Sequence, residues 1–592
     1  MRTFIKNEHG FIVFLSLLMV MISLGYTVGY LHFVMGERIL FSQRFAETRA
    51  RYNAISGLTP INALIRSPNY NTNADTTLDE QELEEMVGGF RDVTGTMVEN
   101  LRTHRSERHG RATGWSTYNS FVNEPIEVEY TMEIKYRARG FEEFMYLTNE
   151  EAPGGGPWLG TTVNFGSGEV LEGLVYSNDD ITMSNFGCPQ FVDYETDTEY
   201  EQSQVYTAGV FNLGGCNENS IFEGVHRDSM PLIEWPPYDG QDLVKAKADY
   251  FYAGNALINT LDPDHEDFHI MTNIEFSPGQ IAIKQWAYQL PPLQMPASAA
   301  EQLEFDENMM KYHPVHYRNT NGLGQNVYRG DLEFQHFDFP RPTDPTEYIV
   351  DDVIMTPEAV IWVDGGQVQV QTADGARIQG RYTIATSTPQ PYKMAHDDET
   401  IRELNCNIWI MNDLLYAGSA INGYIPPGNP NRLGLLSGGN IIVANTAVNG
   451  KRNSAGGADV RINAAMIAMN ESFMIQYWQN STTGYTFLDG TSIKGDGRGT
   501  RPPFIPATGT ADIRGLVMIY GSVVQDKRGY LKRNAPPPGT GGYNITPGIG
   551  YEKDYHYDRN LRKFPPPEWP ETKNSDGSSS LELSGIGEYL GE

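Results

Sequence analysis

Cysteine and basic residues are scarce in this 592-residue sequence, and each scarcity argues against a class of protein. None of the three cysteines has the paired spacing of a zinc site. Cys188 and Cys216 could close one loop in an oxidising envelope, the alternative being that both stay buried thiols like Cys406. Lys and Arg total 44 against 75 Asp and Glu, a formal net charge of −31. Because binding phosphates needs basic side chains, this charge argues against a nucleic-acid partner.

Known catalytic motifs are also missing. The sequence contains no G-x-S-x-G, no H-E-x-x-H and no phosphate-binding P-loop. We therefore assign no catalytic residue, no cofactor-binding residue and no metal ligand, and we expect a protein that is not an enzyme. Calcium is the one cofactor left open, because residues 262–269 offer several carboxylates, although a solvated acidic loop is the preferred interpretation.

One enzymatic alternative remains, a surface carbohydrate-active enzyme in which paired carboxylates do acid–base work. Asp351, Asp352 and Asp364 lie beside expected strands and are its candidate acids. Three tryptophans could stack on sugars, although buried packing is their commoner role: Trp158, Trp478 and Trp569.

Long apolar runs are rare too, and the only one covers residues 11–35. As a helix it is roughly 37 Å long, enough to cross a bilayer core of about 30 Å. A short leader with Arg2 and Lys6 precedes it and ends at Gly10, so the cleavage-like point lies before the apolar run, unlike in a secretory signal. The helix would stay attached after a cut between Gly10 and Phe11, with its basic end in the cytoplasm.

The helical pattern continues beyond the apolar run to about residue 56. Phe41, Phe45, Tyr52 and Ile55 recur at steps of three, four and seven, which makes one apolar stripe on an otherwise charged helix. Such a stripe must pack against either the globular part of the protein or neighbouring helices.

The short leader ending in Gly10-Phe11, followed directly by an apolar helix, resembles the N-terminus of type IV pilins and pseudopilins. The resemblance implies cleavage between these two residues by a prepilin peptidase. It also implies packing of the helix against other pilins or pseudopilins. Major pilins carry Glu at the fifth mature position, where this chain has Leu15. That departure resembles minor pseudopilins at a filament tip and puts ordinary polymerisation in doubt.

The second half of the helix, residues 37–58, is similar to a PilX-type N-terminus. Two further parts of the chain are similar to bacterial envelope proteins that join a pilin-like N-terminus to a β-rich domain of unknown function. The first covers 173–191, and the second runs from 408 to 441 and continues in 521–529, 555–559 and 565–570. This second resemblance implies an architecture but no activity.

The rest of the chain is expected to be β-rich, since it has 60 Gly, 35 Pro and 33 Tyr. Residues 126–136 alternate between apolar and polar and predict a half-buried strand, with 141–147 as its hairpin partner. Short strands between turn residues then recur, which favours a parallel β-helix-like stacked solenoid, with β-sandwich domains as the alternative. Three asparagines fit turns or stacked asparagine ladders: Asn178, Asn412 and Asn440.

The predicted fold class is therefore mainly β with a long N-terminal α-helix. The expected segments begin with a prepilin-like leader (1–10), a membrane and pilin-like helix (11–57) and an α+β connecting region (58–157). A first β-rich segment (158–225), a Pro-rich mixed segment (226–345), the main β-rich domain (346–570) and a flexible tail (571–592) follow.

The function expected from this organisation is that of a minor pilin or pseudopilin-like structural protein, acting in assembly priming or adhesion. It would cross the inner membrane once, with the exterior domain outside the cytoplasm or on a surface filament. The first alternative is a signal-anchored structural envelope protein that joins no filament, and the second is the carbohydrate-active enzyme.

Overall fold

The chain forms two compact units, which are described separately. The helix unit comprises residues 1–101, 105–138 and 581–592, and the β unit comprises 102–104 and 139–580. The computed structural model describes residues 8–67, 70, 76–77, 89–99, 106–120, 122–151, 163–183, 187–196, 199–235, 239–254, 268–289, 317–318, 341–394, 397–444, 446–449, 458–476, 484–486, 492–494, 512–529, 531–533, 549–573 and 580–589.

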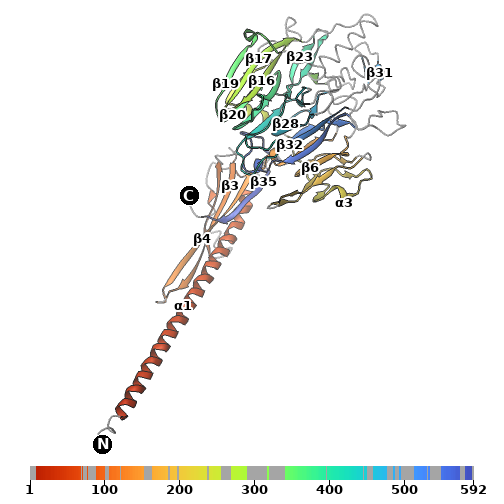
Figure 1. The fold of residues 1–592 in the computed structure, drawn as a ribbon. Coiled ribbons are helices and arrows are strands. Elements are labelled where there is room, and N and C mark those ends of the chain that lie inside the picture. Colours follow the sequence, from red (N-terminus) through yellow and green to blue (C-terminus); the bar gives the residue numbers. More distant parts are fainter. Residues whose placement is uncertain are drawn as a thin grey trace, which may run out of the picture. The chain divides into compact units, whose positions relative to one another are not determined.

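The helix unit pairs one long helix with one antiparallel sheet (Figure 1). In its described part the strand order is β1-β2-β3-β4-β35, and every pair is antiparallel. Its elements are α1 (Glu8–Ile65), β1 (Thr76–Thr77), β2 (Phe90–Glu99), β3 (Ser106–Asn119), β4 (Pro125–Ala138) and β35 (Leu581–Glu588).

The first half of α1 has no cover within the helix unit. Every described side chain from Phe11 to Met35 is exposed. The helix is long and apolar enough to cross a membrane, a test that a signal sequence near the N-terminus would also pass. The apolar N-terminal helix thus exists as expected, and it is compatible with a single-pass anchor.

The second half of α1 packs on the sheet through small side chains. Ala46, Ala50 and Ala54 are buried, and larger apolar residues take over in the last two turns. Because alanine is short, the helix backbone approaches the sheet closely. At Gly114 of β3 an added Cβ would lie 2.1 Å from the backbone oxygen of Ala50.

The apolar stripe predicted on this helix lies on another face. Phe41, Phe45, Tyr52 and Ile55 are 72%, 62%, 67% and 44% exposed. Among the described residues, the sheet of the helix unit therefore does not cover this apolar stripe.

The strand predicted over 126–136 is confirmed as β4, but the hairpin partner predicted for it is wrong. Its neighbours are β3 and β35, and Phe141–Glu143 forms the 3-10 helix η1 of the other unit. The tail expected to be flexible from residue 571 contains β35, which pairs with β4 from Leu581 onward. Leu581 packs against the core of the helix unit, and this contact stabilises the strand.

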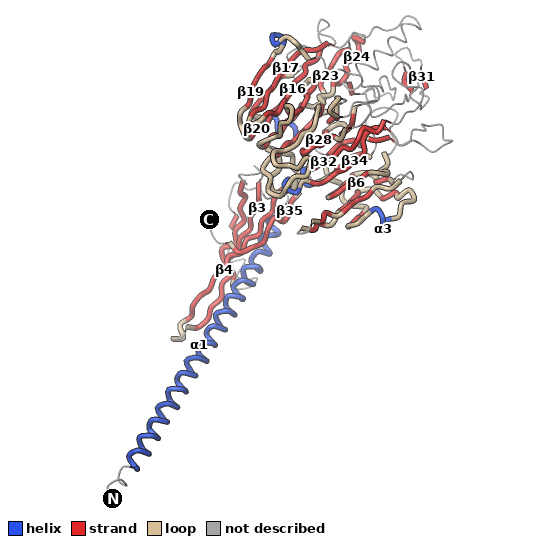
Figure 2. The backbone as a smooth tube through the Cα atoms, viewed as in Figure 1, coloured by secondary structure: helices blue, strands red, loops and turns tan. Residues whose placement is uncertain are grey.

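The β unit is built mainly of strands (Figure 2). Its largest sheet, fourteen-stranded among the described residues, has the order β14-β12-β7-β5-β32-β28-β26-β22-β20-β15, with β6, β9, β33 and β34 attached beside β32. The strands of this sheet are β5 (Tyr146–Glu150), β6 (Glu169–Glu172), β7 (Leu174–Ser177), β9 (Gln190–Val192), β12 (Gln204–Thr207), β14 (Val225–Arg227), β15 (Tyr250–Ala253), β20 (Glu358–Asp364), β22 (Arg381–Thr386), β26 (Arg432–Ser437), β28 (Val460–Ala468), β32 (Asp512–Lys527), β33 (Lys532–Arg533) and β34 (Ile549–Tyr557).

A second sheet of the β unit has the order β19-β17-β16-β21-β25-β27-β29 within the described ranges. Its strands are β16 (Phe268–Ser277), β17 (Gln280–Gln289), β19 (Val350–Ile354), β21 (Gln367–Thr372), β25 (Ile408–Ile410), β27 (Ile441–Val443) and β29 (Phe473–Ile475). The smaller pairings join β8 (Ile181–Thr182) with β13 (Phe211–Asn212), β10 (Tyr194–Glu195) with β11 (Tyr200–Glu201), β18 (Tyr317–Arg318) with β24 (Asp397–Leu404) and β23 (Gln390–Met394), and β30 (Gly484–Thr486) with β31 (Ser492–Lys494). The short helices are α3 (Glu218–Ile221), α4 (Asp239–Ala246), η4 (Pro345–Glu347) and η5 (Arg559–Arg562).

From β20 to β29 the chain alternates between these two sheets, except for β23 and β24, which pair in a smaller sheet. β20, β22, β26 and β28 pair in parallel in the large sheet, and β21, β25, β27 and β29 pair in parallel in the second sheet. Gly365 and Gly366, both with positive φ, link β20 to β21, a conformation that glycine adopts without strain. The predicted class, mainly β with one long N-terminal helix, is thus confirmed. The sheets are open, and the stacked solenoid stays a prediction.

Buried amide side chains connect neighbouring strands of the second sheet. Asn407 donates from Nδ2 to Gln367 Oε1 at 3.0 Å, and Asn440 donates from Nδ2 to Asn407 Oδ1 at 3.1 Å. The next contact is the backbone N–H of Ser472, which donates to Asn440 Oδ1 at 3.2 Å. We call these four residues the amide ladder. The ladder role predicted for Asn440 is therefore confirmed.

The other two predicted asparagines also have structural partners. Asn178 donates from Nδ2 to Asn149 Oδ1, and Asn149 donates in turn to Asp526 Oδ1, which makes a second, shorter ladder. Asn412 accepts from the backbone N–H of Thr372 and donates to its carbonyl oxygen.

The close contact between β3 and α1 leads to a first prediction. Gly114→Ala places a methyl group against the backbone of α1, which cannot yield without the helix moving, so we expect a loss of about 2 to 3 kcal/mol in unfolding free energy. Gly587→Ala in β35 is the control, because its new Cβ meets nothing within 4 Å. Chemical denaturation of both variants measures the difference, and equal stability would contradict this packing.

The amide ladder leads to a second prediction. Asn440→Ala leaves the carbonyl oxygen of Asn407 and the N–H of Ser472 with one partner fewer in a buried place, so we expect a loss of about 2 to 3 kcal/mol. Asn212→Ala is the control, because Asn212 is exposed on β13. Thermal unfolding of the two variants tests the ladder, and a similar small shift in both would argue against it.

Candidate functional site

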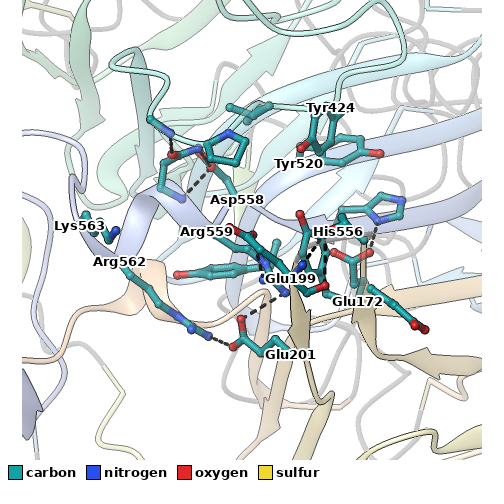
Figure 3. A pocket seen from close by; sticks show the side chains of 18 of the residues that line it. Glu172, Glu199, Glu201, Tyr424, Tyr520, His556, Asp558, Arg559, Arg562 and Lys563 are labelled. Carbon is teal, nitrogen blue, oxygen red and sulfur yellow. Dashed lines mark hydrogen bonds and ion pairs between the residues drawn. The ribbon is translucent and has the colours of Figure 1, made fainter.

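The described part of the β unit contains a pocket of about 1030 Å³. Its walls come from segments far apart in the sequence: the end of β6, the β10–β11 hairpin, residues 424–428, β32, β34 and η5. Figure 3 shows the side chains of these segments converging. We call this space the tyrosine pocket, after Tyr194, Tyr424 and Tyr520 in its walls.

Two arginines of η5 hold the hairpin at one side of the pocket. Arg562 lies 2.5 Å from a carboxylate oxygen of Glu201, and Arg559 lies 3.2 Å from the other oxygen of that group. Arg559 also covers the ring of Tyr194, with 3.1 Å between its guanidinium carbon and the ring centroid. Charge pairing and a cation–π contact therefore both attach β10 and β11 to η5.

His556 is held between two carboxylates on the opposite side. Its Nδ1 lies 3.1 Å from Glu172 and its Nε2 lies 2.9 Å from Asp554, while its ring stacks on Tyr520 at 4.5 Å between centroids. Burial alone would lower the pKa of His556, but the hydrogen bonds and charges of Asp554 and Glu172 outweigh burial and raise the pKa to about 9. His556 is therefore a cation at neutral pH and links β34 to β6.

The aromatic rings form a continuous wall. Tyr424 meets Tyr520 edge to face, with 6.1 Å between ring centroids (Figure 3). Burial raises the pKa of Tyr520 to about 12, and it also raises that of Tyr194, together with the nearby hydroxyl of Tyr424. Tyr194 and Tyr520 are therefore neutral hydrogen-bonding groups at neutral pH.

Three polar atoms of pocket-lining residues are buried and have no hydrogen-bond partner among the described residues. They are the hydroxyl of Tyr557, Oδ2 of Asp558 and Nε of Arg559. Asp558 is almost fully buried, which raises the pKa of its carboxyl although the charge of Arg432 opposes the shift. Unpaired buried polar atoms are uncommon in native proteins, and these three have almost no accessible surface, so they belong to the interior behind the pocket wall.

A second charged cluster lies inside the β unit. Arg528 pairs with Glu151 at 2.8 Å and with Glu169 at 3.3 Å, and Lys553 pairs with Glu169 at 2.8 Å. Burial, only partly offset by Glu169, lowers the pKa of Lys553 to about 8. Each charge has an opposite partner and Arg528 lies over the ring of Phe165, so the charges of the cluster are balanced within the fold.

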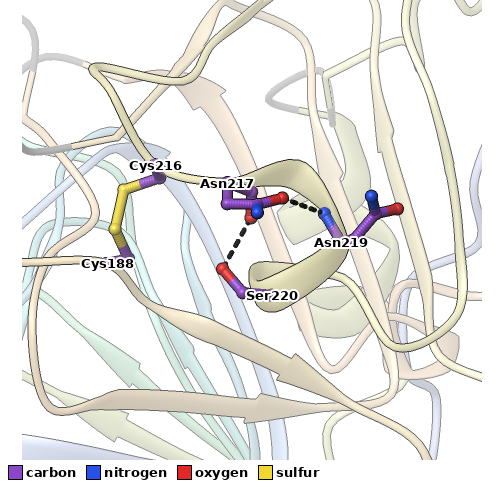
Figure 4. Close-up of a disulfide and its surroundings, with 5 residues drawn as sticks. All are labelled: Cys188, Cys216, Asn217, Asn219 and Ser220. Atoms are coloured by element: carbon purple, nitrogen blue, oxygen red, sulfur yellow. Dashed lines mark hydrogen bonds between the residues drawn. A yellow bond between two sulfur atoms is a disulfide. The ribbon is translucent and has the colours of Figure 1, made fainter.

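The residues singled out from the sequence lie elsewhere. Gly10 and Phe11 are in the first turns of α1, and Phe11 is 65% exposed. Cys188 and Cys216 form a disulfide next to α3, which Asn217 caps by accepting from the N–H of Asn219 (Figure 4). This is the pairing that the sequence analysis left open.

The candidate acids are not brought into one group. Asp351 and Asp352 are on β19 of the second sheet, where Asp351 lies 3.6 Å from Lys284, whereas Asp364 ends β20 of the large sheet and lies 3.4 Å from Lys245. Trp569 is buried, and Trp158 and Trp478 lie outside the described residues, as do residues 262–267 of the acidic loop considered for calcium.

Sequence reasoning missed the tyrosine pocket because its residues are distant in the chain. The run from Tyr555 to Arg559 was the one available signal, since His556 and Arg559 both contribute to the pocket. Within the described ranges, no group of three or more His, Cys, Asp or Glu side chains is arranged to hold a metal ion. No protein-family model, no curated protein and no solved structure matches the chain.

The raised pKa of His556 leads to a third prediction. Since the folded-state pKa lies above the unfolded value of about 6.5, the stabilisation from charged His556 is complete below pH 6.5 and is lost as pH rises through 9. We expect wild type to exceed His556→Gln by on the order of 3 kcal/mol at pH 6, and we expect this difference to fall between about pH 6.5 and pH 9 and to be nearly gone above pH 9.

Denaturation of both proteins across this pH range measures the effect. The difference between the two curves is the readout, because the lowered pKa of Lys553 changes the stability of both proteins in the opposite direction. A difference that does not change with pH would rule out a charged His556 between Glu172 and Asp554.

Proposed function

We propose that this protein is a minor pilin or pseudopilin-like structural subunit, which places its β unit outside the membrane by means of α1. The leader ending at Gly10, the apolar helix behind it and the packing of the second half of that helix on an antiparallel sheet all support the proposal. Its work would be assembly priming or adhesion, performed by surfaces.

The observation that carries the proposal is the division of α1 into two faces. Its own sheet covers the alanine face at Ala46, Ala50 and Ala54, yet Phe41, Phe45 and their neighbours on the other face remain exposed. Exposed large apolar side chains in a row mark a surface that another apolar surface covers. A membrane covers the first half of such a helix, and helices of similar subunits would cover the second.

Leu15 favours a special position in such an assembly. A carboxylate inside hydrocarbon is costly and is retained where a partner neutralises it. With Leu15 at the fifth mature position, the chain offers no such charge to a neighbour's N-terminal amine, and this suits a subunit placed at a tip. The alternative is a signal-anchored envelope protein that joins no filament.

We further propose that the β unit is a stacked solenoid. Three features support this architecture: the alternation of consecutive strands between two sheets, their parallel pairing, and the amide ladder that joins successive turns. A stack of this kind would present a binding surface on the β unit.

The fourth prediction concerns the N-terminus. If the proposal holds, intact mass spectrometry of the membrane-extracted protein will find a chain that begins at N-methylated Phe11. Gly10→Val should block this cut and abolish incorporation into sheared surface filaments, while Gly36→Ala, whose new Cβ meets nothing within 4 Å, should change neither.

Retention of Met1 in the wild type would favour the plain signal anchor. Cleavage after residue 35, which would release a soluble exterior, would contradict both the pilin-like proposal and the anchor. Electron microscopy of cells with and without the protein then separates a filament subunit from a processed protein that stays in the membrane.

A further inference from the structure

We propose that the tyrosine pocket binds a short neutral oligosaccharide. The idea that this sugar is the ligand of an adhesive surface rests on the proposed function. The binding itself depends on the β unit and not on processing of the leader. The pocket of about 1030 Å³ is at the upper end of the range of about 300 to 1,000 Å³ typical of small-molecule sites.

The ion pairs around the pocket argue for an uncharged ligand. Arg559 and Arg562 already face the carboxylates of Glu199 and Glu201, and the cation of His556 lies between Glu172 and Asp554. A strongly charged ligand would have to compete with these contacts for its counter-charge. A neutral ligand can instead accept and donate hydrogen bonds while the ion pairs stay in place.

The aromatic wall argues for a ligand with flat apolar faces. Tyr424 and Tyr520 come from different segments and lie edge to face, and Tyr194 is on the facing hairpin. A pyranose ring presents a face of C–H groups that stacks on such rings. A tyrosine carries its hydroxyl at one end of the ring, where the hydroxyl groups at the sugar's rim would meet it.

The mixed polar lining of the pocket argues for hydroxyl groups in particular. Glu199 and Glu201 carry acceptors, Arg562 and Lys563 carry donors, and the hydroxyl of Tyr424 serves as either. A sugar hydroxyl is both donor and acceptor, so one class of ligand can meet both kinds of group. A simple cation or a simple anion would satisfy only one side of this set.

The test uses the full-length protein in detergent and three immobilised probe sets: neutral short oligosaccharides of glucose, mannose, galactose and xylose, uronate oligosaccharides, and a random peptide library. We expect binding to at least one neutral oligosaccharide, followed by isothermal titration calorimetry with that sugar. Neutral sugars should compete for the site in solution, while uronates of the same length should bind more weakly.

Variants locate the binding in the pocket. Tyr424→Ala removes one ring of the wall and should weaken binding about tenfold, whereas Tyr520→Phe keeps the ring and should weaken it by only about two- to threefold. Tyr250→Ala on β15, outside the pocket, is the control and should bind like wild type. Thermal unfolding of each variant identifies any loss that comes from misfolding.

The proposal is overturned if no neutral oligosaccharide binds at millimolar concentration, if only uronates or only peptides bind, or if folded Tyr424→Ala binds like wild type. Failure of the pilin-like proposal has a different signature, namely an uncut N-terminus in a protein that still binds the sugar.

Discussion

The fold of the β unit depends on how its buried polar groups are paired across neighbouring strands. A chain that turns from one sheet to the next must bury amide groups at the corners, and each unpaired group costs about 1 to 3 kcal/mol. The amide ladder solves this problem, because Gln367, Asn407 and Asn440 each provide a partner for the next strand. The strands are therefore mutually dependent, and none is stable alone.

Paired polar groups also frame the tyrosine pocket. β34 lies between β32 and β6 in the large sheet, and the ion pairs of His556 with Glu172 and Asp554 join β34 to β6 on one side. Arg559 and Arg562 hold the β10–β11 hairpin through Glu201 on another side. The pocket is the space left between these two sets of ion pairs.

The sequence predicted features that depend on local pattern. The apolar run from Phe11 specified α1, alternation specified β4, and Asn440 was correctly placed in a ladder. Prediction from the sequence failed where partners are distant in the chain. The neighbours of β4 could not be predicted from the residues of β4, because β35 follows β4 only after the β unit. The pocket was missed for the same reason, since Glu172, a partner of His556, and Glu201, a partner of Arg559, are hundreds of residues away in the chain.

The pairing of β35 with β4 has a consequence for how such a chain can vary. Leu581 lies opposite Ala138, and the N–H of Arg139 donates to the carbonyl of Ser580 at 2.8 Å, so the chain leaves and re-enters the small sheet at the same point. The chain between β4 and β35 therefore takes the place of the turn in a two-stranded hairpin. A tight turn could replace it without disturbing either strand, and a different globular head could be grafted there, because insertions are best tolerated where the two ends are adjacent.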